Sequence, residues 1–522
     1  MDAFTGLLEP PWLASLWLPS SWLPWSIPGL YLLAALITVL ARRTETGWRL
    51  ARGASLIALL AALCAPALLV LSSSPLTATR LAGTAGLVLV TFLGWVIVRF
   101  SGPYLAGEPC QKRFLSGALV TLAGAALVSA TDHLAVLALA WSATGLGLHR
   151  LLTLYPHRPG AQRAARKHFV SARLADLTML VAVVLIARDT GTLSLSALSA
   201  SGGAAPLTAG LTAAAVLLAI TAIIRCAQLP LHGWVLQVME APTPVSALLH
   251  AGVVNLGGLV LIKMAWLINT SPAAQWLLLL AGGLTTAIAA LAMIAQSNIK
   301  VRLAWSTCAQ MGFMLVECAL GAWHLALLHL LGHSLYKAFA FLNAGDRVMR
   351  ARRARLSPKV SGALSPLLVA ALVAVALLVP ILHGLQWLQG SWAVFALISL
   401  IALTPLLAGL RPGRGGAAAR TGLTALAVVG LGLVWHRVFG ALLTPLPGDQ
   451  ATTAQIVWIT ALFVALLVLQ ARLRAGHHDQ RLHRALANGL YLDQWINRLP
   501  GLHRFGGQRP ATPAWREQEH TS

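Results

Sequence analysis

The sequence predicts an all-α polytopic membrane protein with about fifteen transmembrane helices, within a range of about 13–15. Hydrophobic residues make up 57% of its 522 residues. Only 10% are charged, whereas soluble globular domains carry about 25%. Apolar runs of roughly 18 to 25 residues, each able to cross a hydrocarbon core of about 30 Å, recur along the chain.

The apolar runs predict helices at residues 26–42, 54–73, 82–100, 114–131, 133–153, 169–188, 208–240, 243–268, 274–295, 301–319, 322–346, 362–386, 391–410, 419–438 and 454–473. The seventh is about 33 residues long, more than the roughly 20 residues of one straight span, so we expect it to be broken.

Basic residues cluster at the ends of the odd-numbered helices, whereas the even-numbered ends carry few, chiefly Arg80, Arg188 and Arg437. The positive-inside rule places the odd ends in the cytoplasm, with a periplasmic N-terminus and a cytoplasmic C-terminus. The formal net charge of +23 is thus spread over short loops and not gathered on one soluble domain. We therefore expect membrane lipids, and no nucleic acid, to meet these charges.

Polar residues interrupt the seventh and eighth helices in the stretch "RCAQLPLHGWVLQVMEAPTPVSALLHAGVVN". Pro230 removes a backbone donor and blocks the helix before it, and Gly233 follows. Arg225 stands one turn before this predicted break, His232 just after it, and His250 two turns into the eighth helix. Ionisable groups at membrane depth are costly, and broken helices mark ion sites in transporters. The stretch is therefore predicted to line an ion path, although a proline kink alone would be structural.

A second polar group lies in "LHLLGHSLYKAFAFLNAGD", within the eleventh helix. His329, His333 and Lys337 are spaced i, i+4 and i+8 and so share one helical face, with Asp346 at the cytoplasmic end. Two histidines at this spacing can bind a metal, but no carboxylate or cysteine lies near them in sequence, and the lysine would repel a cation. We expect no metal in this chain. The stripe is interpreted as groups of tunable pKa that relay protons with water between them.

Four acidic residues fall within or beside the apolar segments: Asp132, Asp176, Glu240 and Glu317. Glu240 ends the broken helix. Asp176 follows Arg173 by three residues, so we expect a local ion pair, whose role is either structural or functional. Glu317 lies late in the tenth helix, where it either faces an aqueous vestibule or joins the path. Asp176, Glu240 and Glu317 are counted among the candidate path residues.

The C-terminal tail, residues 475–522, is basic and has no apolar run long enough to span a membrane. Its segment "NGLYLDQWINRL" is amphipathic. Such a segment either lies on the membrane interface as a helix or serves as a dock for a partner.

Several motifs resemble a known family. "QLPLHGWVLQVMEAPTPVSALLHAG", "NIKVRLAWSTCAQMGFM" and "GHSLYKAFAFLNAG" resemble, in this order, motifs of the proton-translocating subunits related to NADH-quinone oxidoreductase subunit L and the Mrp antiporters. "YLAGEPCQKRF" and "NGLYLD" match more loosely. The resemblance implies two inverted five-helix repeats, each with a broken helix. It divides the chain into five parts: N-terminal helices (1–110), a first repeat (111–268), a second repeat (269–410), C-terminal helices (411–474) and a basic tail (475–522).

The chain also departs from this family. The family has a glutamate, essential to proton pumping, after the tryptophan of helix five, whereas Ser142 follows Trp141 here. The family's lysine on broken helix seven aligns with Arg225, which stays charged near pH 7. Residues 362–410 contain no lysine to match that of the second broken helix, and no long lateral helix follows the last span. The respiratory pumping machinery is therefore only partly present.

"WSATGLGLHRLL", together with the broken-helix motif, resembles one branch of the family: the DabB-type membrane subunits of bacterial complexes that accumulate dissolved inorganic carbon. This resemblance implies the bacterial inner membrane. It also implies a soluble, cytoplasmic DabA-like partner, related to β-carbonic anhydrases, that carries zinc. This chain would then be a transport subunit without enzymatic activity and without a cofactor of its own.

We hypothesise that the chain conducts a cation, most simply a proton, down its gradient, and so drives one-way hydration of CO2 to bicarbonate by the partner. Lys337, His333 and His329 would be the carriers of the second repeat, and His250 and Glu240 those of the first. Arg225 would be a fixed charge that tunes its neighbours. The alternatives are a cation/proton antiporter or respiratory pump subunit, and a passive membrane anchor for a soluble enzyme. The sequence leaves open whether H⁺ or Na⁺ is conducted.

Overall fold

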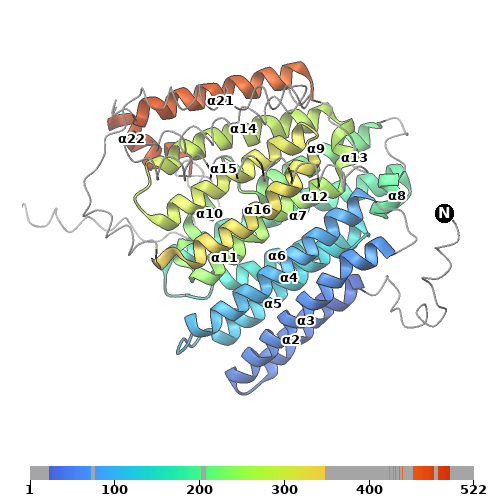
Figure 1. The fold of residues 1–522 in the computed structure, drawn as a ribbon, viewed down its shortest axis with the longest axis vertical. Helices are drawn as coiled ribbons and strands as arrows, with labels where there is room; N and C mark the ends of the chain where they lie inside the picture. Colours follow the sequence, from blue (N-terminus) through green and yellow to red (C-terminus); the bar gives the residue numbers. More distant parts are fainter. Residues whose placement is uncertain are drawn as a thin grey trace, which may run out of the picture.

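Long apolar helices pack side by side in the computed structural model (Figure 1), which describes residues 23–71, 77–200, 207–346, 451–474 and 480–493 and single positions between 423 and 438. Nine helices in these residues are long and apolar enough to cross a membrane, which confirms an all-α membrane fold. The described helices are α2 (Leu23–Leu40), α3 (Thr44–Leu71), α4 (Ala78–Tyr104), α5 (Gln111–Ala130), α6 (Leu134–Leu152), α7 (Pro159–Thr190), α8 (Leu195–Ala200), α9 (Ala209–Arg225), α10 (Gly233–Gln237), α11 (Thr243–Ala251), α12 (Leu256–Lys263), α13 (Ala265–Thr270), α14 (Pro272–Ile294), α15 (Ile299–Ala319), α16 (Trp323–Leu342), α21 (Thr453–Arg474) and α22 (Gln480–Ala487).

Small residues let neighbouring helices approach closely, as is usual where lipid provides no hydrophobic drive for association. Between α14 and α15, a Cβ added to Gly282 would lie 2.5 Å from the carbonyl oxygen of Gly312. Between α5 and α6, a Cβ on Gly124 would lie 2.9 Å from Ala140 O. Side chains from different helices are thereby brought into direct contact in the interior.

The predicted break in the seventh helix is confirmed. α9 ends at Arg225, Ala227 adopts a left-handed φ of 52°, a cis peptide bond joins Leu229 to Pro230, and α10 begins at Gly233. The backbone N–H of Leu229 donates to Thr285 Oγ1 on α14 at 3.1 Å. A side chain from a neighbouring helix thus satisfies a donor that the break exposes.

The eighth helix, predicted as continuous over 243–268, is instead divided into α11, the 3₁₀ turn η3 (Val253–Asn255), α12 and α13. The backbone leaves the helical path at Gly252, with φ −114° and ψ −68°. The Asn255 amide donates to Ala251 O at 2.7 Å and to Ser334 Oγ at 2.6 Å. The asparagine side chain therefore satisfies the carbonyl that its own backbone N–H would have bonded in a continuous helix.

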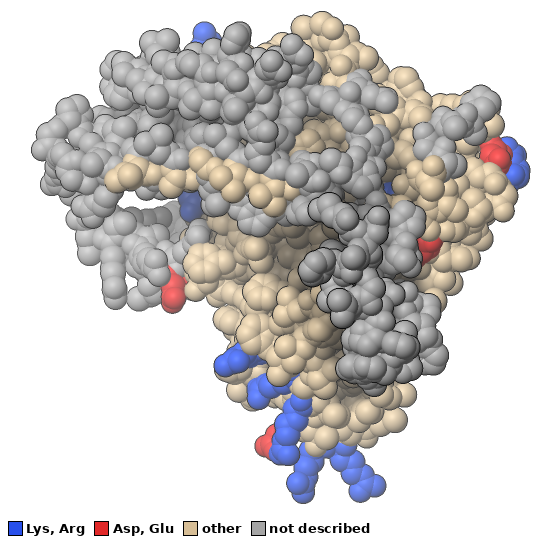
Figure 2. All heavy atoms as spheres, turned by 45° about the vertical axis from the view of Figure 1, so that its right-hand side comes forward, with Lys and Arg blue, Asp and Glu red and all other residues tan. Residues whose placement is uncertain are grey.

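One end of the bundle, here called the basic end, gathers the loops that the charge pattern assigns to the cytoplasm. Lys and Arg side chains concentrate at the lower end of the molecule in Figure 2, below flanks that carry few charges. Lys112 donates there to Ala41 O at 2.6 Å, which ties the start of α5 to the end of α2. α7 begins at Pro159, ten residues before the predicted start, so its basic first turns extend the helix at this end.

The helices predicted at 362–386, 391–410 and 419–438 fall outside the residues that the structure describes continuously. The full helix count, the domain boundaries and the second broken helix therefore stay predictions.

Candidate functional site

A buried pair opens a chain of polar groups between α11, α15 and α16. Glu317 Oε2 and His329 Nδ1 lie 3.0 Å apart, with side chains only 5% and 14% exposed. Glu317 thus supplies the carboxylate that the sequence around the histidines lacks, from the preceding helix.

His333 continues this polar chain. Its ring centre lies 6.1 Å from that of His329. His333 Nδ1 lies 2.9 Å from Gln310 Oε1, and Nε2 lies 3.3 Å from the carbonyl oxygen of His250. The buried His333 therefore joins a helix of the second predicted repeat to one of the first.

His250 and Lys337 meet through α15. His250 Nδ1 lies 3.0 Å from Thr307 Oγ1, and its ring stacks on Phe341 at 4.3 Å. Thr307 donates to the carbonyl oxygen of Leu303 at 3.1 Å, and the fully buried Lys337 ammonium donates to the same oxygen at 3.3 Å. The polar chain thus runs from Glu317 to Lys337 and includes all three residues of the predicted stripe.

Two links in this polar chain are main-chain carbonyls, those of His250 and Leu303. A carbonyl oxygen accepts hydrogen bonds but has no proton to pass on. Side chains or water must therefore bridge these two links when a proton moves. The same holds between His329 and His333, whose ring centres lie 6.1 Å apart and between which the described residues show no hydrogen bond. The sequence suggested water between the side chains throughout.

A second cluster surrounds Arg225, at the end of α9. Its guanidinium lies over the Trp141 ring, 4.7 Å from the ring centre. The predicted ion pair between Arg173 and Asp176 is present at 2.7 Å, and Ser142 neighbours that carboxylate. A carboxylate from α7 therefore lies beside the α6 position at which the resembled family has its glutamate.

The break itself presents His232, whose Nδ1 lies 3.1 Å from Pro230 O and whose ring lies 5.0 Å from that of Trp305. No contact between Glu240 and His250, the two predicted carriers of the first repeat, is present among the described residues. It is exposed on η2 (Val238–Glu240), against Gly160 at the start of α7, whereas His250 is buried. The 3₁₀ turn carries Glu240 outward to the bundle surface, and His250 belongs instead to the polar chain.

The tail returns to this break, which the sequence did not reveal. Asp493 accepts hydrogen bonds from Lys167 at 2.7 Å to each carboxylate oxygen, and from the Gln237 amide at 2.9 Å. Gly489, with φ 59°, packs on Trp305. We call residues 488–493, held by Lys167 and Gln237, the tail clasp. The described part of the amphipathic segment thus docks on its own bundle. The only signal in the sequence was the loose match of "NGLYLD" to the family.

Lys263, also missed, ends α12 and is 1% exposed. Its ammonium donates to the carbonyl oxygens of Val128, Ser129 and Thr131 at 3.0, 3.0 and 2.7 Å. All three donors of the ammonium are used at the C-terminal end of α5. Its positive charge interacts favourably with the negative end of the helix dipole. Lys263 is therefore best explained as structural.

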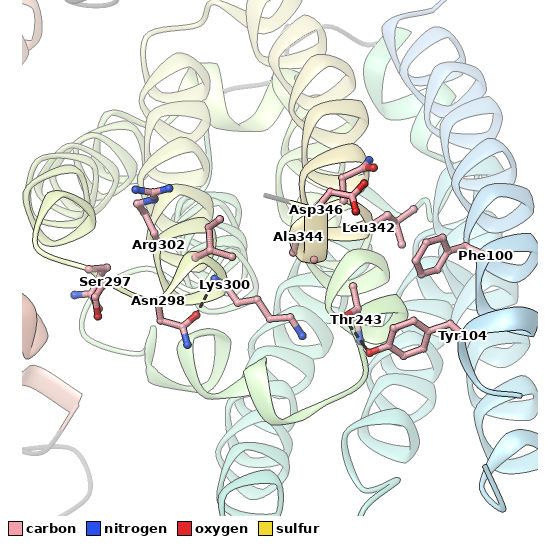
Figure 3. A pocket seen from close by; sticks show the side chains of 14 residues that line it. Phe100, Tyr104, Thr243, Ser297, Asn298, Lys300, Arg302, Leu342, Ala344 and Asp346 are labelled. Carbon is pink, nitrogen blue, oxygen red and sulfur yellow. Dashed lines mark hydrogen bonds between the residues drawn. The ribbon is translucent and has the colours of Figure 1, made fainter. Parts of the chain in front are cut away.

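A cleft of about 1060 Å³ opens at the basic end, between α4, α11, α15 and α16. Lys300 and Arg302 line it with Asn298, Thr243 and Asp346 (Figure 3). Among the described residues, no group of three or more His, Cys, Asp or Glu side chains is arranged to hold a metal.

Comparisons with known proteins match this architecture. The family model described as NADH:quinone oxidoreductase/Mrp antiporter, transmembrane region, matches residues 131–399. The chain is 42% identical over 428 residues to the probable inorganic carbon transporter subunit DabB of Hydrogenovibrio crunogenus, covering 79% of this chain and 80% of that protein. It is 35% identical over 261 residues to NADH-quinone oxidoreductase subunit L of Mycobacterium tuberculosis, covering 49% and 41%. The solved Mrp complex of a Dietzia species contains a similar fold, with a TM-score of 0.61, 20% identity and coverage of 90% of this chain and 58% of that chain.

The relatives are transport subunits of membrane complexes and not enzymes in themselves. The family match spans half of the chain, and the inorganic carbon transporter relative aligns over most of both proteins. The chain therefore belongs to the NADH:quinone oxidoreductase/Mrp antiporter family, alongside the DabB inorganic carbon transporter subunits, as a multi-pass, cation-conducting membrane subunit of a larger complex.

Proposed function

We propose that this chain conducts protons down their gradient through the polar chain from Glu317 to Lys337, and that this flow drives one-way CO2 hydration by a soluble partner. The contact between Glu317 and His329 is the single observation that carries the proposal. A carboxylate and an imidazole in contact can exchange a proton, and burying such groups in a membrane is costly without a function.

The two carbonyl links of the polar chain are the gates of this path. A proton on His333 crosses to the neighbourhood of His250 only when a side chain turns or a water enters, and the same holds between Thr307 and Lys337. Flow is thereby limited to moments of rearrangement, as coupled transport requires.

The energy of one proton is sufficient for accumulation. A charge that falls through about 150 mV releases roughly 3.5 kcal/mol. Each tenfold in concentration costs about 1.4 kcal/mol, so one proton per bicarbonate sustains a ratio in the hundreds.

The partner is a DabA-like, zinc-carrying protein related to β-carbonic anhydrases, at the cytoplasmic face of a bacterial inner membrane. The names of the DabB relatives support an inorganic carbon role. The basic end, with its cleft and the tail, is the cytoplasmic face in this proposal, and the N-terminus is periplasmic. Zinc analysis of the complex purified through this chain tests the partner.

Lys337→Arg tests the path most directly. Arginine keeps a buried positive charge and a donor toward Leu303 O, but it does not release its proton near pH 7. We expect the variant to insert in the membrane normally, to lose proton flow in proteoliposomes, and to fail to support carbon-dependent growth of a host without carbonic anhydrase. Lys300→Arg, at the half-buried first turn of α15, is the matched control and should behave as wild type. Wild-type flux in Lys337→Arg would refute the path.

The departures from the pump pattern count against the alternatives. Ser142 and Arg225 occupy positions at which a respiratory pump is expected to carry its glutamate and lysine. A passive anchor has no use for the buried groups of the polar chain, and it predicts that growth is insensitive to uncouplers.

A further inference from the structure

The cluster around Arg225 is rich in hydrogen-bond donors. Arg225 is 2% exposed, and none of its three side-chain nitrogens has an acceptor among the described residues. The same is true of Trp141 Nε1, on the ring beneath the guanidinium, and of Arg173 Nε. Buried polar groups in proteins nearly always have a partner, so five such nitrogens in one cluster call for an explanation.

The cluster carries excess positive charge. Its carboxylate, Asp176, lies 2.7 Å from Arg173 Nη2, although neither of its oxygens has a hydrogen-bond partner of regular geometry among the described residues. Among the ion pairs of the described residues none includes Arg225. Two guanidinium groups therefore face one carboxylate. Arg225 lies in the low-dielectric interior, where an uncompensated charge is strongly disfavoured, whereas the Arg173 side chain is 35% exposed.

Both guanidinium groups lie close to the backbone of Gly145. A Cβ added to Gly145 would lie 3.3 Å from Arg225 Nη1 and 3.4 Å from Arg173 Nη2. The two groups thus converge on a glycine, and a side chain at that position would press against both. His168, 1% exposed and with neither ring nitrogen partnered among the described residues, lies near both.

We infer that the first repeat binds a small planar oxyanion of the bicarbonate class between Arg225, Arg173 and Gly145. The rigid fork of a guanidinium matches the paired oxygens of such an anion, and one negative charge neutralises the cluster. A lysine would provide the charge without the fork, which gives a reason for arginine at position 225. The choice of bicarbonate rests on the proposed function, whereas the anion site rests on the donors alone.

Anion-dependent thermal stability tests the site. The full chain, with any subunits that remain bound, is placed in lipid nanodiscs, and its unfolding temperature is followed against bicarbonate, nitrate or chloride, with gluconate holding ionic strength constant. A ligand that binds only the folded state raises that temperature saturably. We expect a saturable rise with bicarbonate and with nitrate, a planar anion that does not titrate in this range.

Two variants localise the effect. Arg225→Lys keeps the charge and removes the fork, and Gly145→Ala adds a methyl group that presses on both guanidinium groups. Each variant should abolish the rise. Arg302→Lys and Gly332→Ala are the matched controls and should keep it, because Arg302 is exposed and a Cβ on Gly332 meets no atom within 4 Å.

The absence of a saturable rise with both planar anions would overturn the site and leave water as the partner of these donors. An equal rise with chloride, or a rise that survives in Arg225→Lys, would also overturn it. The measurement needs no cation flow. A saturable rise in unfolding temperature without proton flux through Lys337 would support the anion site and contradict the proposed function. Proton flux without such a rise would contradict the anion site alone.

Discussion

Replacing Asp493 with alanine should release the tail clasp from the break between α9 and α10. The carboxylate accepts two hydrogen bonds from Lys167 at 2.7 Å and one from Gln237 at 2.9 Å. Losing one partner of a buried charge pair costs about 2–5 kcal/mol. Lys167 and Asp493 are 11% and 23% exposed, so water reaches both, and the low end, about 2 kcal/mol, applies.

That loss corresponds to a roughly 30-fold rise in the undocked population. Hydrogen exchange of the backbone amides at 486–493 measures it, because exchange reports local opening. The double variant Lys167→Asp with Asp493→Lys should recover much of the protection by reversing the pair. Asp346→Ala, which removes an exposed carboxylate at the same end, should change nothing. Unaltered exchange in Asp493→Ala would show that the clasp is held by its apolar contacts instead.

Three further outcomes are expected. Glu317→Gln removes the negative charge beside His329, which stabilises a protonated imidazole by about 1.5–3 kcal/mol. The variant should slow proton flux in proteoliposomes about tenfold or more, and unchanged flux would exclude Glu317 from the path. Gly282→Ala forces α14 from α15 at a cost of about 1–3 kcal/mol and should lower the unfolding temperature, whereas Gly332→Ala should not; equal temperatures would contradict the close crossing. Lys263→Met leaves three buried carbonyls unpaired and should lower the free energy of unfolding by about 3 kcal/mol. The loss should appear as a lower yield of monodisperse protein in size-exclusion chromatography, and full yield would show that those carbonyls find other donors.

Features that depend on one segment were predictable from sequence. Pro230, and the excess length of the helix that contains it, predicted the break, because both act on the local backbone. The i, i+4, i+8 spacing placed His329, His333 and Lys337 on one face, because helical geometry alone fixes that relation.

Features that depend on how helices face one another were not predictable. The contact of Glu317 with His329 depends on the register of α15 against α16, and no periodicity encodes it. Lys167 and Asp493 are 326 residues apart, so nothing local links them. Asn255 divides its helix through a side-chain contact with Ser334, 79 residues away, which no local pattern indicates.

The tail clasp has a consequence for how the protein is made. The break between α9 and α10 is inserted in the membrane while Asp493, 256 residues beyond Gln237, has yet to be synthesised. Until then Lys167 and Gln237 lack that carboxylate, and the clasp does not cover His232 and Trp305. The first repeat therefore matures late in translation, and a ribosome stalled after α16 leaves a membrane intermediate whose broken helix is unsecured.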